Sequence, residues 1–239
     1  MPVGKYLQKK RLQKYCQGYI QYEKLIYHLK EVMDLDKRKF SHFAYDIIPN
    51  PKGNGYVVTP KVSEEEIEEC YSKFVLELRH ELDRVDAYFI NFVNQVELKL
   101  NVVRSELFEK TFNTQFWPTK ESNQFHFQNL LKELEVIKTI IEDFKTNIIP
   151  INKFTLIKIY EKQQYLVGKT SSKLETYDNG KEYLNWELDH WMDQPLINRY
   201  SFCSNGNNII CNLLKRIDCL ISKCRIKFLP KVLNEELIF

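Results

Sequence analysis

The chain has 239 residues, of which 44% are hydrophobic and 28% charged, and its formal net charge is +3. This composition excludes an intrinsically disordered chain and supplies enough apolar side chains for a sizeable core. Only 7 glycines and 8 prolines are available for turns, which disfavours a many-stranded sheet and makes a helical protein the expected class.

Two short helices are expected at the start of the chain, over residues 3–13 and 17–33, and together they would form a hairpin over residues 3–33. Up to residue 30 this segment is strongly basic, with a single acidic residue, Glu23, against Lys5, Lys9, Lys10, Arg11, Lys14, Lys24 and Lys30. Residues 34–62 contain the run PNPKGNG and are too polar and broken for an element longer than a turn. We expect them to form the longest loop.

The longest predicted element is a helix over residues 63–112. Its apolar residues recur in steps of three and four, at Ile67, Tyr71, Phe74, Leu78, Leu82, Val85, Phe89, Phe92, Val96, Leu100, Val103 and Leu107. Ser63 and Glu66 have the spacing of a capping box at its start. At about 1.5 Å per residue the helix is roughly 70 Å long, and its stripe can be buried only against other long helices. The sequence therefore predicts an all-α, elongated bundle.

A second long helix, over residues 120–148, is expected to run antiparallel to the first and to end at Pro150. Asn152 is expected to cap a further helix over 153–166. We expect residues 1–205 to form one helical domain. Residues 206–239 would add a C-terminal helix and a tail, which either packs on that domain or links it to a further one.

The cysteines and histidines do not indicate a metal site or an enzyme. The six cysteines lack CxxC spacing, so reduced thiols are favoured over disulfides or metal ligands. No histidine pairs with another ligand at metal-binding spacing, and there is no Gly-rich phosphate loop or GxSxG motif. We therefore expect no catalytic activity, no cofactor and no metal.

Several absent patterns indicate a cytoplasmic protein. The start of the chain lacks the apolar run of a signal peptide, and no stretch reaches about 18 apolar residues, so no transmembrane segment is expected. Attachment to the cytosolic face of a membrane through a partner or a further domain stays compatible with this prediction.

Two motifs resemble those of SPX domains. Gly4, Lys5 and Leu7, followed by YIQYEKL at residues 19–25, resemble the KFGK start and YIDY-like helix of that family. The run NKFTLIKIYEK at residues 152–162 is similar to the family segment NxTGFRKILKKYDK. The resemblance covers residues 1 to about 170. It implies a helical sensor of inositol polyphosphates or pyrophosphates that signals phosphate status to a phosphate transporter, a polyphosphate polymerase or a signalling protein, in cis or in trans.

The resemblance also implies a ligand site. It assigns the phosphate-binding tyrosine to Tyr22, a deep lysine to Lys162 and a surface lysine to Lys158. Lys5, Lys30 and Lys169 complete the candidate set. The chain departs from the family pattern at four positions, where the family lysines are replaced by Pro2, Ile26, Glu161 and Tyr165.

Spacing alone is compatible with such a site. Lys158 and Lys162 lie one helical turn apart, and Tyr22 and Lys30 lie two turns apart, so each pair shares a helix face. Ammonium groups and a tyrosine hydroxyl suit a ligand with several phosphates. From the spacing alone, the simpler interpretation is that these helix lysines are merely solvated. The two motifs favour a ligand site instead.

Two other function classes stay open. A helical adaptor that binds a protein partner, with a decayed ligand site, is the main alternative. Nucleic-acid binding is disfavoured, because the basic hairpin lacks a recognised reader motif and the acidic long helix would repel a phosphate backbone.

Overall fold

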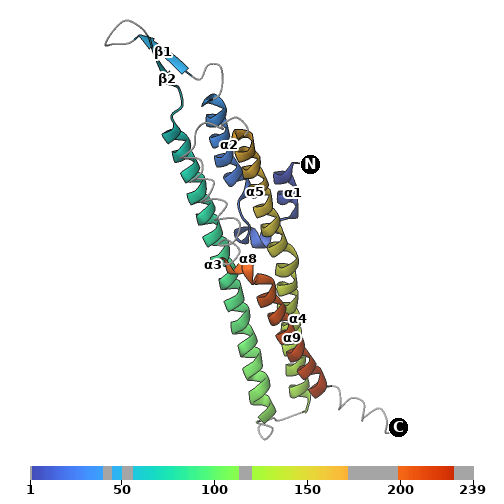
Figure 1. Ribbon diagram of the computed structural model, residues 1–239. Helices are drawn as coiled ribbons and strands as arrows, with labels where there is room; N and C mark the ends of the chain where they lie inside the picture. Colours follow the sequence, from blue (N-terminus) through green and yellow to red (C-terminus); the bar gives the residue numbers. More distant parts are fainter. Residues whose placement is uncertain (1, 40–44, 50–55, 113–119, 172–198, 229–239) are drawn as a thin grey trace. The chain divides into compact units, whose positions relative to one another are not determined.

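The computed structural model describes residues 2–39, 45–49, 56–112, 120–171 and 199–228 (Figure 1). Its helices are α1 (Val3–Lys10), α2 (Tyr22–Lys39), α3 (Glu64–Phe112), α4 (Lys120–Asp143), α5 (Ile149–Ser171), α8 (Ser201–Ser204) and α9 (Gly206–Phe228). A 3-10 segment η1 (Gln13–Gly18), a π-helical turn η3 (Phe144–Ile148) and the strands β1 (Tyr45–Pro49) and β2 (Tyr56–Pro60) complete the described chain. The predicted all-α class is confirmed, with one small hairpin of strands added to it.

The chain forms two compact units that alternate along the sequence. The first unit contains α1, α2, both strands, α3 up to Val85 and α5 from Ile151 onward. The second contains η1, α3 from Asp86 onward, α4, η3, α8 and α9. Neither unit coincides with the predicted segments 1–205 and 206–239, and that division remains a prediction.

Helix α3 has the predicted start and the predicted buried stripe. The Glu66 backbone N–H donates to Ser63 Oγ at 3.1 Å, and the Ser63 N–H donates to Glu66 Oε2 at 3.1 Å, which is the reciprocal pattern of a capping box. The side chains of Phe74, Leu82 and Leu100 are almost completely buried. Periodicity and capping chemistry together therefore predicted this 49-residue helix correctly.

In the first unit, side chains of α3 hold the turn that leads into α2. The Gln21 N–H donates to Glu81 Oε2 at 2.9 Å, and Arg84 Nη2 donates to the Tyr19 carbonyl at 2.7 Å. Arg84 also binds Glu81 at 2.7 Å. Burial opposes the charged form of Glu81, but the hydrogen bonds from Arg84 and from the Gln21 backbone lower its pKa below the ordinary value of 4.5. This charged pair fixes the start of α2.

The predicted helix end at Pro150 is wrong. The chain stays helical from residue 120 to 171, through α4, η3 and α5. The Ile149 N–H donates to the carbonyl of Phe144, five residues earlier, and this wider turn accommodates Pro150, which lacks an N–H. Asn152 is also not the predicted cap: its buried side-chain oxygen accepts the Ile20 N–H at 3.0 Å.

The predicted loop 34–62 is also partly wrong. Helix α2 continues to Lys39, and β1 pairs with β2 in an antiparallel hairpin. The β-branched residues Ile47 and Ile48 pair in register with Val58 and Val57, and such residues favour extended backbone. Residues 40–44 and 50–55 of the predicted loop, which include most of the run PNPKGNG, lie outside the described chain.

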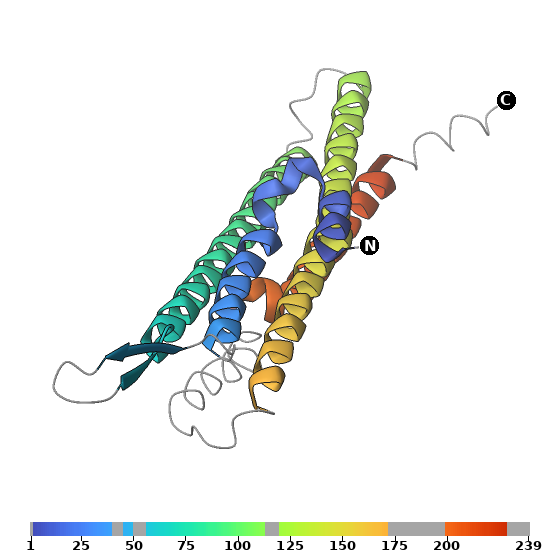
Figure 2. The same ribbon diagram turned by 90° about the horizontal axis from the view of Figure 1, so that it is seen from above.

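The core of the second unit is built around Phe144. Its ring stacks on Phe92 at a centroid distance of 3.9 Å and meets the edge of Tyr15 at 6.2 Å. In this unit α3 and α4 run in opposite directions, as predicted, and α9 lies beside α4 (Figures 1 and 2). An ion pair between Lys138 and Asp218, at 2.8 Å, joins α4 to α9.

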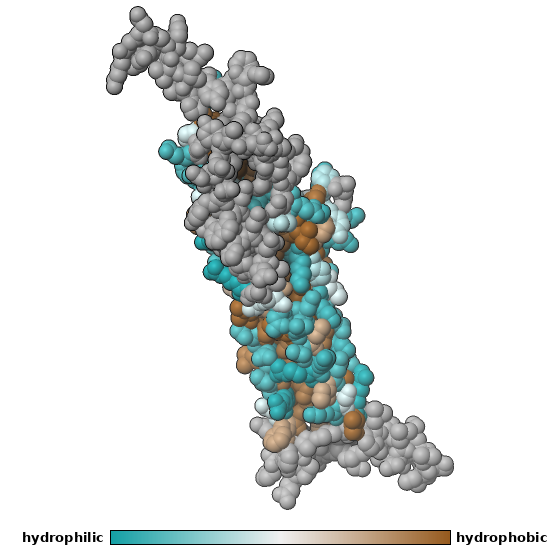
Figure 3. Space-filling model, viewed as in Figure 1, coloured by the Kyte–Doolittle hydropathy of each residue, from teal (hydrophilic) through white to brown (hydrophobic). Residues whose placement is uncertain are grey.

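The coloured part of the surface in Figure 3 is mainly hydrophilic, with smaller hydrophobic areas between. Among the exposed apolar residues are Leu98 and Phe108 of α3 and Ile226 of α9. None of the described helices combines the length and the apolar character that crossing a lipid bilayer requires.

Candidate functional site

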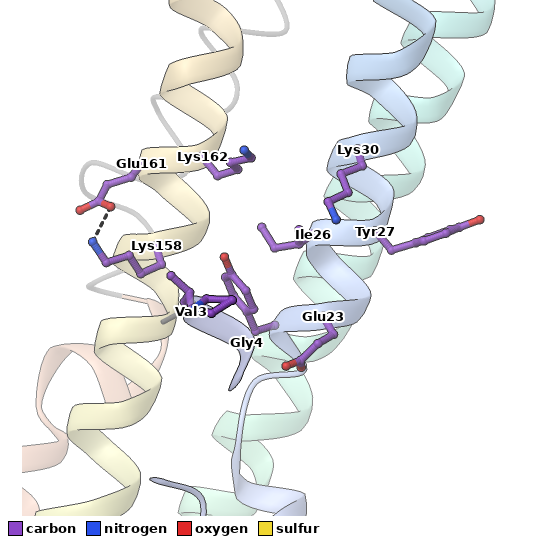
Figure 4. A pocket seen from close by; sticks show the side chains of 11 residues that line it. Val3, Gly4, Glu23, Ile26, Tyr27, Lys30, Lys158, Glu161 and Lys162 are labelled. Carbon is purple, nitrogen blue, oxygen red and sulfur yellow. Dashed lines mark hydrogen bonds and ion pairs between the residues drawn. The ribbon is translucent and has the colours of Figure 1, made fainter. Parts of the chain in front are cut away.

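A cavity of about 650 Å³ lies in the first unit, where the amino-terminal end of α1 meets α2 and α5 (Figure 4). We call it the α1/α2/α5 pocket. Its walls are formed by Pro2, Val3, Gly4, Tyr22, Glu23, Ile26, Tyr27, Lys30, Lys158, Glu161 and Lys162. Residues 2–30 and residues 158–162, which are far apart in the sequence, therefore meet at one place.

Close packing of α1 forms one wall of this pocket. The rings of Tyr6 and Phe154 contact each other at a centroid distance of 5.5 Å, which holds α1 against α5. A Cβ atom on Gly4 would lie 2.9 Å from Glu23 Oε1 on α2, which is closer than carbon and oxygen normally approach. Because Oε1 is the far end of a flexible side chain, a larger residue at position 4 would mainly displace the Glu23 carboxylate.

The basic side chains of the pocket come from two helices. Lys158 and Lys162 extend from α5, and Lys30 extends from the facing helix α2 (Figure 4). Lys162 points toward α2, whereas the ammonium group of Lys158 points away from α2 and toward Glu161. Lys30 makes no ion pair with a residue of the described chain. The pocket thus has cations on two opposite walls.

Acidic side chains accompany these lysines. Glu161 Oε2 lies 2.6 Å from Lys158 Nζ, and Glu23 lies 3.7 Å from the Arg11 guanidinium. The five ionisable acidic and basic side chains of the wall, three lysines and two glutamates, give a net charge of 3 − 2 = +1. The pocket is therefore only weakly cationic.

Tyr22 supplies a neutral hydroxyl to the pocket. Partial burial raises the pKa of its phenol above the ordinary value of 10, and the negative charges of Glu23 and Glu161 raise it further. The hydroxyl therefore keeps its proton at physiological pH and can donate a hydrogen bond to an anion.

Four of the six predicted site residues line the pocket, namely Tyr22, Lys30, Lys158 and Lys162. Lys5 is exposed on α1 and does not line it. Lys169 belongs to the last part of α5, where the structure does not describe the side chains. That these residues bind a ligand remains a prediction.

Sequence reasoning missed several wall residues. Glu23, Tyr27 and Lys30 follow one another at spacings of four and three residues and so share one helix face. Helical periodicity could therefore have identified Glu23 and Tyr27. Val3 comes from α1, and only the packing of α1 brings it to the pocket. Among the described residues, no group of three or more His, Cys, Asp or Glu side chains is placed to hold a metal ion.

Neither a family model nor a curated protein sequence matches the chain. A solved structure does match it: the SPX domain of Chaetomium thermophilum glycerophosphodiester phosphodiesterase 1, in complex with inositol hexakisphosphate. The likeness covers 94% of this chain and 99% of that one, at a TM-score of 0.53 and 16% sequence identity. It extends over both units, and it agrees with the fold that the two sequence motifs imply. The chain therefore has the fold of an SPX domain.

Proposed function

We propose that the chain binds inositol polyphosphates or pyrophosphates in the α1/α2/α5 pocket. One observation carries this proposal: a single cavity is lined by Tyr22 and Lys30 and also by Lys158 and Lys162, which lie more than a hundred residues later in the chain. The structurally similar SPX domain is in complex with inositol hexakisphosphate, which supports the same class of ligand here.

The chemistry of the wall suits this ligand. Each lysine ammonium group offers three donors with a positive charge, and the Tyr22 hydroxyl offers one neutral donor. Charge-assisted hydrogen bonds to phosphate are about twice as strong as neutral ones. Lys30 and Lys162 face each other from α2 and α5, so one ligand with several phosphates can contact both helices.

A ligand held in this way would report phosphate status to an effector. The effector would be a phosphate transporter, a polyphosphate polymerase or a signalling protein, in the same chain or in a separate one. The similar SPX domain belongs to a phosphodiesterase, which supports a regulatory domain joined to another activity. In this proposal the described domain is cytoplasmic and has no catalytic role of its own.

Isothermal titration of the protein with inositol hexakisphosphate tests the proposal. We expect saturable binding that weakens at least about tenfold in the double variant Lys158→Ala, Lys162→Ala, because two charge-assisted contacts are lost. Lys153→Ala is the matched control, since Lys153 lies on the same helix but does not line the pocket. Equal binding by the wild type and the double variant would contradict the proposed site.

A helical adaptor with a decayed ligand site is the second candidate. It is favoured by two observations in the pocket: Ile26 provides no donor, and Lys158 is already paired with Glu161. The same titration separates the two functions, because an adaptor with a decayed site would give no saturable binding of any inositol phosphate.

A further inference from the structure

We infer that Glu161 is a specificity-determining residue of the α1/α2/α5 pocket: it competes with ligand phosphates for Lys158 and so disfavours the most highly phosphorylated ligands. The inference rests on the proposed function and concerns which members of the ligand class the pocket prefers.

The geometry of the ion pair between Lys158 and Glu161 is the first argument. Glu161 Oε2 lies 2.6 Å from Lys158 Nζ, and both residues line the pocket. The ammonium group of Lys158 is turned toward this carboxylate and away from α2 (Figure 4). A phosphate that binds Lys158 must therefore displace the carboxylate or share the ammonium group with it.

The charge of the pocket carries the second step. Its wall has a net charge of only 3 − 2 = +1, whereas each phosphate monoester carries about −1.5 to −2 at neutral pH. A displaced Glu161 stays covalently attached beside the ligand, where its charge repels every nearby phosphate. The unfavourable energy grows with the number of phosphates, so hexakisphosphate is penalised more than a trisphosphate.

The uncharged part of the wall carries the third step. Ile26 projects from α2 toward α5 and is 8% exposed, and Val3 also lines the pocket. Neither side chain offers a hydrogen-bond donor. A phosphate placed against this surface loses water without gaining a partner, which is costly. The three lysines of the wall can each serve one phosphate of a trisphosphate, and the further phosphates of a hexakisphosphate gain no additional lysine from this wall.

Glu161 can be changed without disturbing the fold. Its side chain is 54% exposed, and exposed ion pairs contribute little to stability. Glu161→Gln removes the charge and keeps the shape of the side chain. Glu68→Gln is the matched control, because Glu68 is an exposed helical glutamate of the same unit that does not line the pocket.

The experiment compares two ligands on three proteins. Inositol trisphosphate and inositol hexakisphosphate are titrated calorimetrically into the wild type, Glu161→Gln and Glu68→Gln at one ionic strength. We expect Glu161→Gln to bind hexakisphosphate about tenfold more tightly and trisphosphate at most about threefold more tightly, by release of Lys158 and loss of the repelling charge. Glu68→Gln should change neither affinity.

The outcomes separate this inference from the function on which it rests. If the wild type binds, and Glu161→Gln gains nothing or gains equally for both ligands, the inference is overturned and the proposed function stands. If none of the three proteins binds either ligand, the proposed function itself is overturned, and the inference falls with it. Glu161→Ala should reproduce the change in the affinity ratio, because the effect depends on the carboxylate.

Discussion

Ile26→Lys adds a cation to the part of the pocket that lacks one. Ile26 lies one helical turn after Tyr22, and its side chain projects from α2 toward α5 (Figure 4). It is 8% exposed, so it belongs to the buried edge of the pocket and not to its rim. The substitution therefore changes both ligand binding and stability, and the structure gives a magnitude for each.

The gain in binding follows from one new charged contact. A hydrogen bond to a charged group contributes about 1.5 to 3 kcal/mol, and ordering a lysine side chain costs about 1.5 to 2 kcal/mol. The net gain is about 0.5 kcal/mol at the middle of these ranges and at most about 1.5 kcal/mol, so the dissociation constant of inositol hexakisphosphate should fall about two- to tenfold.

The loss of stability follows from the burial of Ile26. Complete burial of an isoleucine contributes about 1.5 to 3 kcal/mol, and the aliphatic part of a lysine retains some of this while its ammonium group extends into the pocket. We expect a loss of about 1 to 2 kcal/mol, which lowers the melting temperature by about 2 to 8 °C for a chain of this size.

Calorimetric titration and thermal melts of the same samples measure both effects. Ile157→Lys is the control, because Ile157 is exposed on α5 and does not line the pocket. This variant adds the same charge outside the pocket. An Ile26→Lys protein that melts below the wild type but binds with unchanged affinity would refute the assignment of residue 26 to the ligand site. An equal gain in both variants would attribute the effect to net charge.

Three further predictions concern the charged groups. Affinity for inositol hexakisphosphate should fall steeply when titrations are repeated at higher salt, since exposed lysine contacts are screened over about 8 to 10 Å in physiological buffer; a flat dependence would exclude them. Lys162→Ala should weaken titrated binding more than Lys158→Ala, because Lys162 points toward α2 whereas the ammonium group of Lys158 is turned toward Glu161; the reverse order would contradict this reason. Glu81→Gln should lower the free energy of unfolding, measured with denaturant at pH 7, by about 1 to 3 kcal/mol. Because its pKa is lowered in the folded protein, the charged Glu81 carboxylate stabilises the fold fully above pH 4.5, and this contribution is lost as the pH falls through the folded pKa. A stability difference between wild type and Glu81→Gln that persists in acid would contradict this prediction.

Local rules in the sequence predicted the long helices well. The stripe and the capping box of α3 depend on neighbouring residues only, and both are present in the structure. Pro150 misled the same reasoning. Its effect is decided by the wider turn between Phe144 and Ile149, and this turn is coupled to a packed aromatic cluster that local spacing does not reveal.

The site could be predicted in part for a similar reason. Tyr22, Lys158 and Lys162 follow from motifs that are short in sequence; Tyr22 lies on α2, and both lysines lie on α5. The pairing of Lys158 with Glu161 could have been derived from their spacing of three residues. The contact of Gly4 with Glu23 depends on how α1 packs on α2, and no local pattern encodes it.

The hydrogen bonds at the start of α2 have a consequence for biosynthesis. The Gln21 N–H is satisfied by a residue 60 positions later, and the Ile20 N–H by Asn152, 132 positions later. A ribosome delivers the chain from its amino terminus, so the hairpin of α1 and α2 is made long before its partners, and closing such long loops costs entropy. The pocket can form only when α5 has emerged. An anion that binds the pocket would therefore stabilise only chains that contain α5.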